Sequence, residues 1–227
     1  MMCQECGCSE IEVNESVTAV NASIGARLRA SLEERGIFVV NLMGAPGSGK
    51  TSVIEHLADA LGAVFVVQGD CESDIDTKRL KARGIGAVQI NTHSGCHLTA
   101  HMVEHALDGV DLTGMRYLFI ENVGNLVCPA GVSVGEHLNV VVSSTTEGDD
   151  KPTKYPHIFR SAKLVIISKS DIADAVGFDA NAYREQLERV TNAKVLHTST
   201  KEPESFARLA HMIGHARDHA LGLPHEH

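Results

Sequence analysis

The chain has 227 residues, 43% of them hydrophobic, and carries a formal net charge of -9 at pH 7. This length suits one good-sized α/β domain with a short extension, and the negative charge argues against nucleic acid or an anionic membrane as the main partner. The first residues are polar and contain cysteine instead of a secretory signal, and no apolar run approaches the ~20 residues of a membrane span. We therefore expect a cytoplasmic protein whose six cysteines are metal ligands or free thiols, since disulfides are rare in that compartment.

The N-terminal block, residues 1–11, holds three cysteines within six positions, in the pattern C-x-x-C-G-C formed by Cys3, Cys6 and Cys8. Thiolates at this spacing can converge on one soft or borderline metal ion, and Gly7 eases the tight turn between two of them. Three sulfurs leave room for a fourth donor, for which the chain-terminal amine is available. We expect a metal-binding tail here; a flexible tail whose thiols bind no particular ligand is the alternative.

Residues 12–35 show the periodicity of an amphipathic helix, and Gly36 marks its end. The apolar residues of this segment are spaced by three or four positions: Val13, Val17, Val20, Ile24, Leu28 and Leu32. Charged residues occupy the other face, as in a helix that lies on a protein surface. We expect this N-terminal helix, which spans residues 12–36 when Gly36 is included, to cover the core of the domain. Packing against a second subunit is the alternative.

From residue 37 to the end, apolar runs alternate with helical patterns. Strands are predicted at 37–43, 63–68, 86–91, 116–121, 138–143, 163–168 and 193–197. Helices are predicted at about 52–61, 74–83, 97–107, 179–191 and 203–220. Most of the strands are nearly continuous apolar runs, which is typical of strands buried on both faces. The alternation predicts an α/β fold, with a mostly parallel seven-stranded sheet and helices on both faces, as a single domain over residues 37–227.

Residues 44–51, Gly-Ala-Pro-Gly-Ser-Gly-Lys-Thr, match the phosphate-binding P-loop pattern G-x-x-x-x-G-K-S/T between a predicted strand and a predicted helix. The glycines allow backbone N–H groups to approach phosphate oxygens, and the following helix adds the positive end of its dipole. Lys50 is expected to reach the β- and γ-phosphates, and the Thr51 hydroxyl to bind Mg²⁺. The residues expected to contact the nucleotide here are Gly44, Gly47, Ser48, Gly49, Lys50, Thr51 and Ser52.

The strand at 116–121 ends in Glu121, at the place where a Walker-B carboxylate lies beside a P-loop strand. Gly124 follows three residues later, where its N–H can meet the γ-phosphate, and many GTPases carry Asp-x-x-Gly at this place. We expect Glu121 to bind Mg²⁺ and to act with Lys50 and Gly124 in catalysis. An acid that only caps the following turn is the alternative.

A second acidic segment, residues 70–76, follows the strand at 63–68 and contains four acids in seven residues. Asp70 is the preferred catalytic residue, either as a Mg²⁺ ligand or as the group that places the attacking water. Asp74 could take the same roles, and for Asp74 and Asp76 the alternative is an acid that stabilises a helix N-terminus through its dipole. The expected Mg²⁺ ligands are therefore Thr51, Asp70 and Glu121.

The strand at 163–168 leads into Ser168, Lys169, Ser170 and Asp171. The Asp171 carboxylate can accept hydrogen bonds from N1–H and the 2-amino group of guanine, which adenine lacks, and the stem of Lys169 can lie over the base. The usual element is Asn-Lys-x-Asp, and Ser168 replaces the asparagine with a shorter side chain that has no amide. We therefore expect GTP to be the nucleotide, with a weakened selectivity for guanine.

A cysteine and a histidine, Cys96 and His97, are adjacent at the predicted start of the helix at 97–107, where a helix N-terminus also favours the thiolate. Cys128 lies seven residues after Glu121. If the parallel topology brings these loops together, the three side chains can share one ion, although three ligands are too few for a closed Zn²⁺ site. A two-fold dimer could complete the site by pairing the loops of two subunits.

Two sets of histidines recur at every fourth position. The first set, which forms one stripe if a helix extends through it, is His93, His97, His101 and His105. The second set, near the C-terminus, is His211, His215 and His219, followed by His225 and His227. Paired histidines at this spacing can chelate metal, but solvated helix faces also carry them, and we expect the C-terminal set to be such a face.

In combination, these segments resemble the HypB family, the GTPases that help to insert nickel into nickel–iron hydrogenase. The resemblance covers nearly the whole chain and rests on the C-x-x-C-G-C tail, the P-loop, and residues 94–98, 121–130 and 146–152 in this order. It implies a SIMIBI-class P-loop GTPase that dimerises with nucleotide, and a Ni²⁺ or Zn²⁺ site at Cys96, His97 and Cys128 near the subunit interface. It also implies work with a HypA-type nickel metallochaperone and a hydrogenase large-subunit precursor.

Two departures from the family pattern matter: Ser168 in the guanine element, and Met2, which adds a residue before Cys3. A urease-type or cobalamin-enzyme GTPase chaperone is a rival in the same class, and the cysteine tail together with Cys96, His97 and Cys128 argues against it. A metal storage or sensing protein with a structural nucleotide site is a rival of another class, and GTP turnover abolished by Lys50→Ala separates it. The sequence favours a GTP-hydrolysing nickel metallochaperone.

Overall fold

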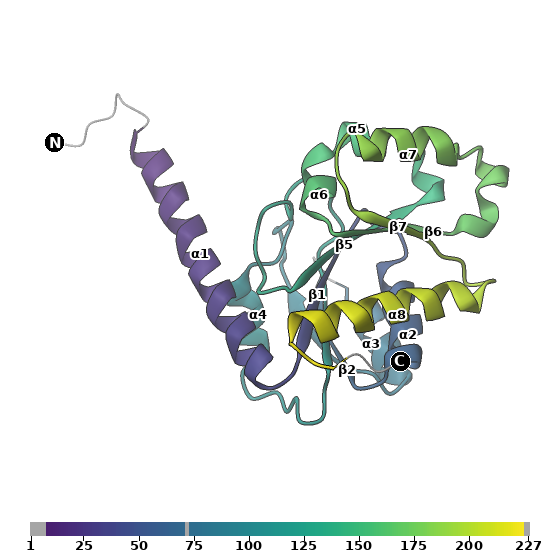
Figure 1. Ribbon diagram of the computed structural model, residues 1–227. Coiled ribbons are helices and arrows are strands. Elements are labelled where there is room, and N and C mark those ends of the chain that lie inside the picture. Colours follow the sequence, from purple (N-terminus) through teal and green to yellow (C-terminus); the bar gives the residue numbers. More distant parts are fainter. Residues whose placement is uncertain (1–7, 71–72, 225–227) are drawn as a thin grey trace.

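The computed structural model describes residues 8–70 and 73–224 and has a parallel sheet at the centre of the molecule (Figure 1). Its strands are β1 (Phe38–Met43), β2 (Val64–Asp70), β3 (Gly86–Asn91), β4 (Tyr117–Glu121), β5 (Leu138–Ser144), β6 (Leu164–Ser168) and β7 (Lys194–His197). They lie in the order β3-β2-β4-β1-β5-β6-β7, and every neighbouring pair is parallel. This confirms the predicted α/β class and places β4, which ends in Glu121, beside the P-loop strand β1.

The helices are α1 (Cys8–Glu34), α2 (Lys50–Leu61), α3 (Ile75–Ala82), α4 (Ala100–Ala106), α5 (Lys151–Lys154), α6 (Pro156–Ser161), α7 (Ala180–Glu188) and α8 (Pro203–Ala220). Short 3₁₀ turns lie at Thr145–Glu147, Ser170–Ile172 and Asp174–Val176. The helical period does not reveal α5 and α6 in the sequence, because four and six residues are too few to repeat it. Both begin with proline in the first turn, where its fixed backbone angle suits a helix start.

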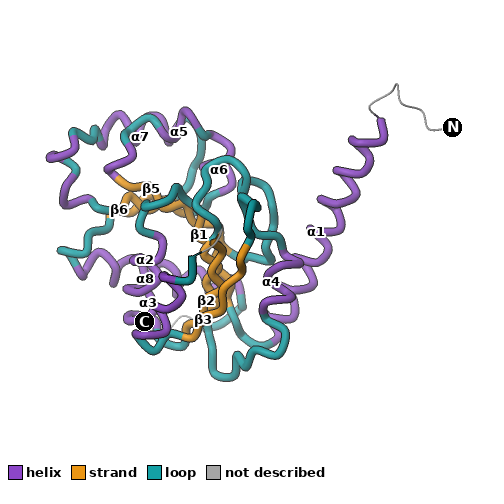
Figure 2. Tube along the Cα trace, turned by 180° about the vertical axis from the view of Figure 1, so that it is seen from behind, coloured by secondary structure: helices purple, strands orange, loops and turns teal. Residues whose placement is uncertain are grey.

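Alternate residues of β1 face opposite sides of the sheet, as the period of a strand requires. Phe38, Val40 and Leu42 pack in a cluster with α2, α3 and α8, whereas Val39 packs in a second cluster with α1 and α4. A third cluster packs α6 and α7 against β5 and β6. Seen from behind, the strands form the middle layer between these helices (Figure 2). Cover on both faces explains why the strands are nearly continuous apolar runs in the sequence.

The helix α1 covers the core only with its C-terminal part. It begins at Cys8 instead of residue 12, and Leu28 and Leu32 near its end are buried in the cluster with β1 and β4. By contrast, Val17 and Val20 are 62% and 59% exposed, and the N-terminal part of the helix projects from the body (Figure 1). The expectation of a core-covering helix is therefore confirmed for the second half and wrong for the first, because that half extends beyond the edge of the sheet.

The parallel topology brings the loops that follow the strands to one edge of the sheet. These loops are the P-loop after β1, the segment after β2, residues 92–99 after β3, and residues 122–137 after β4. They carry most of the predicted nucleotide and metal residues. Among the described helices, none is both long and apolar enough to cross a membrane.

Candidate functional site

The P-loop joins β1 to α2 as predicted, and α2 begins at Lys50. Gly49, just before the helix, has a φ of 95°, a left-handed conformation that favours glycine. Lys50 Nζ donates hydrogen bonds to the carbonyl oxygens of Gly44, at 3.3 Å, and Ala45, at 3.0 Å. Burial lowers the pKa of Lys50, against the attraction of nearby carboxylates. The ammonium group therefore lies inside the loop, where phosphate oxygens can replace the two carbonyls as its partners.

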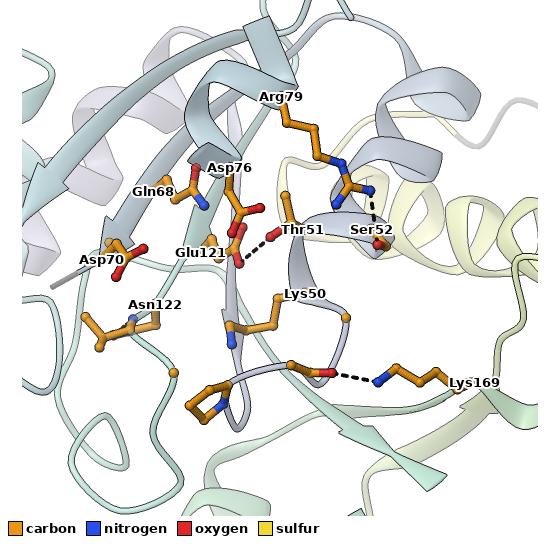
Figure 3. A pocket seen from close by; sticks show the side chains of 16 residues that line it. Lys50, Thr51, Ser52, Gln68, Asp70, Asp76, Arg79, Glu121, Asn122 and Lys169 are labelled. Carbon is orange, nitrogen blue, oxygen red and sulfur yellow. Dashed lines mark hydrogen bonds between the residues drawn. The ribbon is translucent and has the colours of Figure 1, made fainter. Parts of the chain in front are cut away.

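A cavity of about 460 Å³ opens beside the P-loop (Figure 3). It lies at the carboxyl ends of β1, β2 and β4, which is where ligands bind to open parallel sheets. Of the residues expected to contact nucleotide or Mg²⁺, the following line it: Gly47, Gly49, Lys50, Thr51, Ser52, Asp70, Glu121, Gly124 and Lys169. Its volume is in the range of small-molecule sites, roughly 300–1,000 Å³.

Glu121 is buried at the end of β4 and accepts a hydrogen bond from Thr51, the residue expected to bind the same Mg²⁺ ion. Thr51 Oγ1 donates a hydrogen bond to Glu121 Oε1 at 2.9 Å, and Glu121 is 5% exposed. Burial raises the pKa of Glu121 to about 7, against the attraction of Lys50. The other oxygen, Oε2, is buried and accepts no hydrogen bond from the described residues. An unpartnered carboxylate oxygen beside a hydroxyl fits a hard divalent cation such as Mg²⁺.

Asp70 and Asp76 both line the cavity with Glu121 (Figure 3). Asp74 is instead the residue before α3, and its carboxylate pairs with Lys78 at 2.8 Å, as expected of an acid at a helix start. Asp76 lies in the first turn of α3, also as expected. After burial, the charges of Asp76 and Asp70 further raise the pKa of Glu121. The helix-dipole argument did not predict that Asp76 also lines the cavity.

Gln68 and Arg79 also line the cavity, and reasoning from motifs missed both. Arg79 Nη2 is 2.5 Å from Glu55 Oε2 and 3.4 Å from Ser52 Oγ, so the side chain ties α3 to α2. Gln68 Oε1 accepts a hydrogen bond from Thr77 Oγ1 at 2.9 Å, which ties α3 to β2. The sequence carries no spacing signal for either residue, because both contacts depend on how α3 packs on the sheet.

The guanine element begins with two side chains that reach the P-loop. Ser168 Oγ donates a hydrogen bond to the carbonyl oxygen of Ser48 at 2.6 Å, and Lys169 Nζ donates one to the carbonyl oxygen of Gly47 at 2.8 Å (Figure 3). Lys169 has a φ of 56°, a left-handed conformation that is uncommon for residues other than glycine. The serine therefore holds the P-loop to the end of β6, although it offers no amide.

Asp171 lies beyond these contacts, on the other side of the turn. Its carboxylate accepts a hydrogen bond from Ser199 Oγ at 2.8 Å and pairs with Lys201 at 3.1 Å. The bonds from Ser199 and Lys201 lower the pKa of Asp171. The carboxylate is thus held ionised, which is the state in which it can accept hydrogen bonds from a base.

Cys96, His97 and Cys128 come together, as the parallel topology predicts. Their ligand atoms all lie within 4.8 Å of one another, and all three residues are half-buried. Cys96 Sγ and His97 Nδ1 are 3.6 Å apart, and neither cysteine of the cluster forms a disulfide. Across the described part of the chain, no other group of three or more His, Cys, Asp and Glu lies close enough to hold a metal ion. Two thiolates and an imidazole are donors that suit Zn²⁺ and Ni²⁺.

The helix after this cluster begins later than predicted. α4 starts at Ala100, and the Thr99 side chain caps it by accepting a hydrogen bond from Met102 N at 3.3 Å. Threonine is a preferred residue before a helix. The Thr99 cap therefore sets the start of α4, and the apolar pattern, which predicted a start at residue 97, does not. Cys96 and His97 lie in the preceding turn, and the expected effect of a helix N-terminus on the thiol is therefore wrong.

The first set of histidines consequently forms no continuous stripe. His93 has a φ of 52° and His97 precedes α4, so that only His101 and His105 share the helix. Of the C-terminal set, His211, His215 and His219 are exposed on α8. Two further predicted groups lie outside the described residues: Cys3 and Cys6 of the tail, and the terminal His225 and His227.

Asn122 connects the end of β4 to the cluster. It follows Glu121, and its Oδ1 accepts a hydrogen bond at 3.0 Å from the backbone N–H of Leu98, the residue after His97. Its amide nitrogen donates to Asn41 Oδ1 at 3.2 Å, and the side chain is buried. A movement of the backbone at Glu121 therefore moves the hydrogen-bond acceptor that holds the histidine loop.

Asn125 makes a second connection, between the P-loop and the other cysteine. Its N–H donates to the carbonyl oxygen of Gly44 at 3.1 Å, and its Oδ1 accepts a hydrogen bond from Cys128 N at 3.2 Å. Just before it, Gly124 is so close to the P-loop that a Cβ there would lie 2.9 Å from Pro46 Cγ. The segment from Gly124 to Cys128 is thus in direct contact with the phosphate loop.

Comparisons with known proteins agree with this geometry. A family model described as CobW/HypB/UreG, nucleotide-binding domain, matches residues 38–197. The chain is 42% identical over 213 residues to the hydrogenase/urease maturation factor HypB of Helicobacter hepaticus, covering 91% of this chain and 88% of that protein. It is 42% identical over 200 residues to the hydrogenase maturation factor HypB of Azotobacter vinelandii, covering 86% of this chain and 66% of that protein. The crystal structure of HypB from Helicobacter pylori in complex with nickel superposes with a TM-score of 0.86 at 36% identity, covering 91% of this chain and 99% of that chain.

Proposed function

Because the chain belongs to the HypB family, within the wider CobW/HypB/UreG group of nucleotide-binding domains, we propose that it is a GTP-hydrolysing metallochaperone that assists nickel insertion into nickel–iron hydrogenase. One observation carries the proposal: Cys96, His97 and Cys128 converge within 4.8 Å, on loops that are bonded to the P-loop and to the end of β4. A relative crystallised in complex with nickel supports nickel as the metal.

In this proposal, the residues that line the cavity beside the P-loop bind GTP and catalyse its hydrolysis. The triphosphate is bound by P-loop N–H groups and the start of α2, with Lys50 as the counter-charge. Thr51, Asp70 and Glu121 are the groups that would hold Mg²⁺, which when bound neutralises the charge that develops on the phosphates. Asp70, which lines the cavity together with Asp76, would orient the attacking water. Asp171, ionised by its hydrogen bonds to Ser199 and Lys201, would choose guanine.

The cluster of Cys96, His97 and Cys128 binds the nickel ion that is to be delivered. Two sulfurs and one imidazole leave a tetrahedral ion with an open position, which water or another donor can take. An open position lets an ion pass to a recipient by ligand exchange, whereas a closed four-ligand site would retain it. Pairing of two subunits with nucleotide bound would bring two such clusters together and close them, so that homodimer formation and release alternate with hydrolysis.

The two ends are coupled through Asn122 and Asn125. Loss of the γ-phosphate would release the segment from Glu121 to Gly124, and that segment continues into Cys128 through Asn125. Nucleotide state would then change the separation of the metal donors directly. The partners we propose are a HypA-type nickel metallochaperone as the source of nickel and a hydrogenase large-subunit precursor as the recipient. The three cysteines of the tail, Cys3, Cys6 and Cys8, would hold nickel at a second site.

The test is nickel titration of the full chain with a non-hydrolysable GTP analogue and with GDP, followed by sedimentation. We expect different nickel affinities and different oligomeric states in the two nucleotide states. Cys96→Ala should remove the cluster's share of nickel binding, and His101→Ala, which removes an exposed histidine on α4, is the matched control. Identical affinities and identical sedimentation with both nucleotides would sink the coupled mechanism.

Two other functions give different outcomes in these experiments. A metal storage or sensing protein would bind nickel normally and hydrolyse no GTP. A chaperone for another nickel enzyme or a cobalamin enzyme would hydrolyse GTP but fail to capture a hydrogenase precursor; the Helicobacter hepaticus relative is named for both hydrogenase and urease, so a urease apoprotein is the second recipient to test. Hydrolysis of ATP as fast as GTP would refute the role proposed for Asp171.

A further inference from the structure

The opposite edge of the sheet carries a groove that the nucleotide and cluster residues do not reach. It measures about 520 Å³ and lies between α8 and the starts of β1, β5, β6 and β7. Three exposed histidines of α8 line it: His211, His215 and His219. We propose that these histidines, defined here as the α8 ladder, form an exchangeable binding site for a divalent transition-metal ion such as Ni²⁺, separate from the Cys96 cluster and independent of its proposed role.

The spacing of the α8 ladder is that of a two-histidine chelate. Residues four apart lie one above the other on a helix face, with Cβ atoms about 5–6 Å apart, and two histidines at this spacing on one helix bind Zn²⁺ in metalloproteases. The ladder contains two overlapping pairs, His211 with His215 and His215 with His219. Because His215 belongs to both pairs, the ladder binds one ion in either of two ways.

A fourth histidine, His137, lines the floor of the groove but is not available as a ligand. Its Nδ1 accepts a hydrogen bond from Val39 N at 2.9 Å, so its proton is on Nε2, which faces Glu33 Oε1 at 3.1 Å. An ion on the ladder therefore has two protein ligands and completes its coordination with water. Such a site binds more weakly than one with two thiolates and exchanges its ion faster.

The other wall of the groove carries Lys163 and Lys194. Their ammonium groups repel a cation and attract an anion, so removing one of them has opposite effects on the two kinds of ligand. For a metal ion, Lys194→Gln raises the affinity; for an anion, the same change lowers it. The charges on α8 nearest the last histidine, Arg217 and Asp218, pair with each other at 3.3 Å and offset one another.

The experiment is a Ni²⁺ titration of the full chain at neutral pH, with binding heat, ultraviolet absorption and NMR signals of the histidine side chains recorded together. Thiolate sites give charge-transfer absorption and the α8 ladder does not. We expect a binding event without new absorption, in addition to those of the Cys96 cluster and of the cysteine tail, with selective paramagnetic broadening of the α8 histidines. His215→Ala should lower its affinity at least about tenfold because both pairs are lost, whereas His211→Ala should lower it only about twofold because one pair remains.

The matched controls are His157→Ala, which removes a lone exposed histidine on α6, and His105→Ala, which breaks the single pair on α4. The proposal is overturned if either control weakens this absorption-free event as much as His215→Ala, or if Lys194→Gln weakens it. In Cys96→Ala the event should persist while the charge-transfer absorption of the cluster is lost. Its disappearance there would show that the ladder is no separate site, and the GTP hydrolysis rate tests the proposed function apart from this result.

Discussion

The nucleotide cavity and the Cys96 cluster lie on neighbouring loops but are built differently. In the cavity, Lys50 and Glu121 are almost fully buried, and each is held by a hydrogen bond of its own side chain. In the cluster, the donors are half-buried, and asparagines bonded to the backbone hold the loops that carry them. The cavity is therefore organised before a ligand arrives, whereas the cluster follows its loops, and those loops are attached to the cavity.

The largest effect is expected from a substitution that disrupts the nucleotide cavity and leaves the Cys96 cluster intact. Lys50→Ala removes the buried ammonium group and should lower GTP hydrolysis by about 10²–10³-fold, as the loss of one transition-state donor does. Without nucleotide, nickel binding at the cluster should equal that of the wild type, because no cluster bond involves this side chain. The measurement is phosphate release beside nickel titration, with Lys78→Ala as the control for an exposed lysine. A parallel loss of nickel binding would refute the separation of the two sites.

The second prediction concerns the pH dependence of stability that Glu121 confers on the cavity. Burial raises its pKa from 4.5 to about 7 in the folded chain, so the proton is bound more tightly in the folded state than in the unfolded one. The stabilising contribution is complete below pH 4.5 and is lost as pH rises through 7, in total about 3 kcal/mol at 1.36 kcal/mol per pKa unit.

Denaturant unfolding of the wild type and of Glu121→Gln from pH 4.5 to pH 8 measures this contribution. The difference in unfolding free energy between the two proteins should decline with pH by about 3 kcal/mol, because only the wild type has a carboxyl group to ionise there. Saturating Mg²⁺ and nucleotide should reduce the decline, since a cation favours the ionised carboxylate. A difference that does not vary with pH would show that Glu121 is ionised at no cost.

The third prediction sharpens the dependence of the cluster on its loops. Asn125→Ala removes the acceptor for Cys128 N and should lower the nickel affinity of the cluster about tenfold, as loss of a group that orients a metal ligand does. Asn125→Asp keeps an acceptor oxygen at the same place and should stay within about threefold of the wild type. Titration of both variants without nucleotide is the measurement. Equal losses in the two would mean that the hydrogen bond does not position Cys128.

The smallest effect is expected at the joint between the P-loop and β6. Ser168→Ala removes the hydrogen bond to Ser48 and should cost about 1 kcal/mol, or about fivefold in GTP affinity. The ratio of GTP to ATP affinity should not change, because the Ser168 hydroxyl contacts the loop. Ser170→Ala, which removes a bond to Thr198 on the other side of the turn, is the control. A changed ratio would show that Ser168 also reads the base.

The sheet and the P-loop could be predicted because both depend on short-range patterns. Continuous apolar runs place all seven strands, and the strand boundaries differ from the observed ones by only a few residues. The meeting of Cys96, His97 and Cys128 could also be predicted, since parallel strands bring their following loops to one edge. Ser168 shows the limit of a motif comparison: the replaced residue looks like a loss in the sequence, and the structure shows a bond to the P-loop in its place.

The failures arise at a local helix cap and where tertiary contacts decide. Thr99 caps α4, and the start of that helix moves past His97 although the histidine spacing is helical. Asp76 and Arg79 reach the cavity because of the way α3 packs, which no local spacing encodes. The apolar residues Val17 and Val20 have the same period as Leu28 and Leu32 but remain exposed, because periodicity describes a face of a helix and not what covers that face.

The projecting helix α1 also fixes an orientation. A helix turns about 100° and advances about 1.5 Å with each residue, and the part of α1 near Leu28 and Leu32 is anchored to the body. Deleting one residue between Val20 and Leu28 would shorten the helix by only about 1.5 Å but would rotate the exposed face that carries Val17 and Val20 by about 100° about the helix axis. Deleting seven residues, close to two full turns, would return that face to nearly its original direction on a helix about 10 Å shorter. The length of the exposed half of α1 and the direction in which its apolar face points can therefore be changed separately.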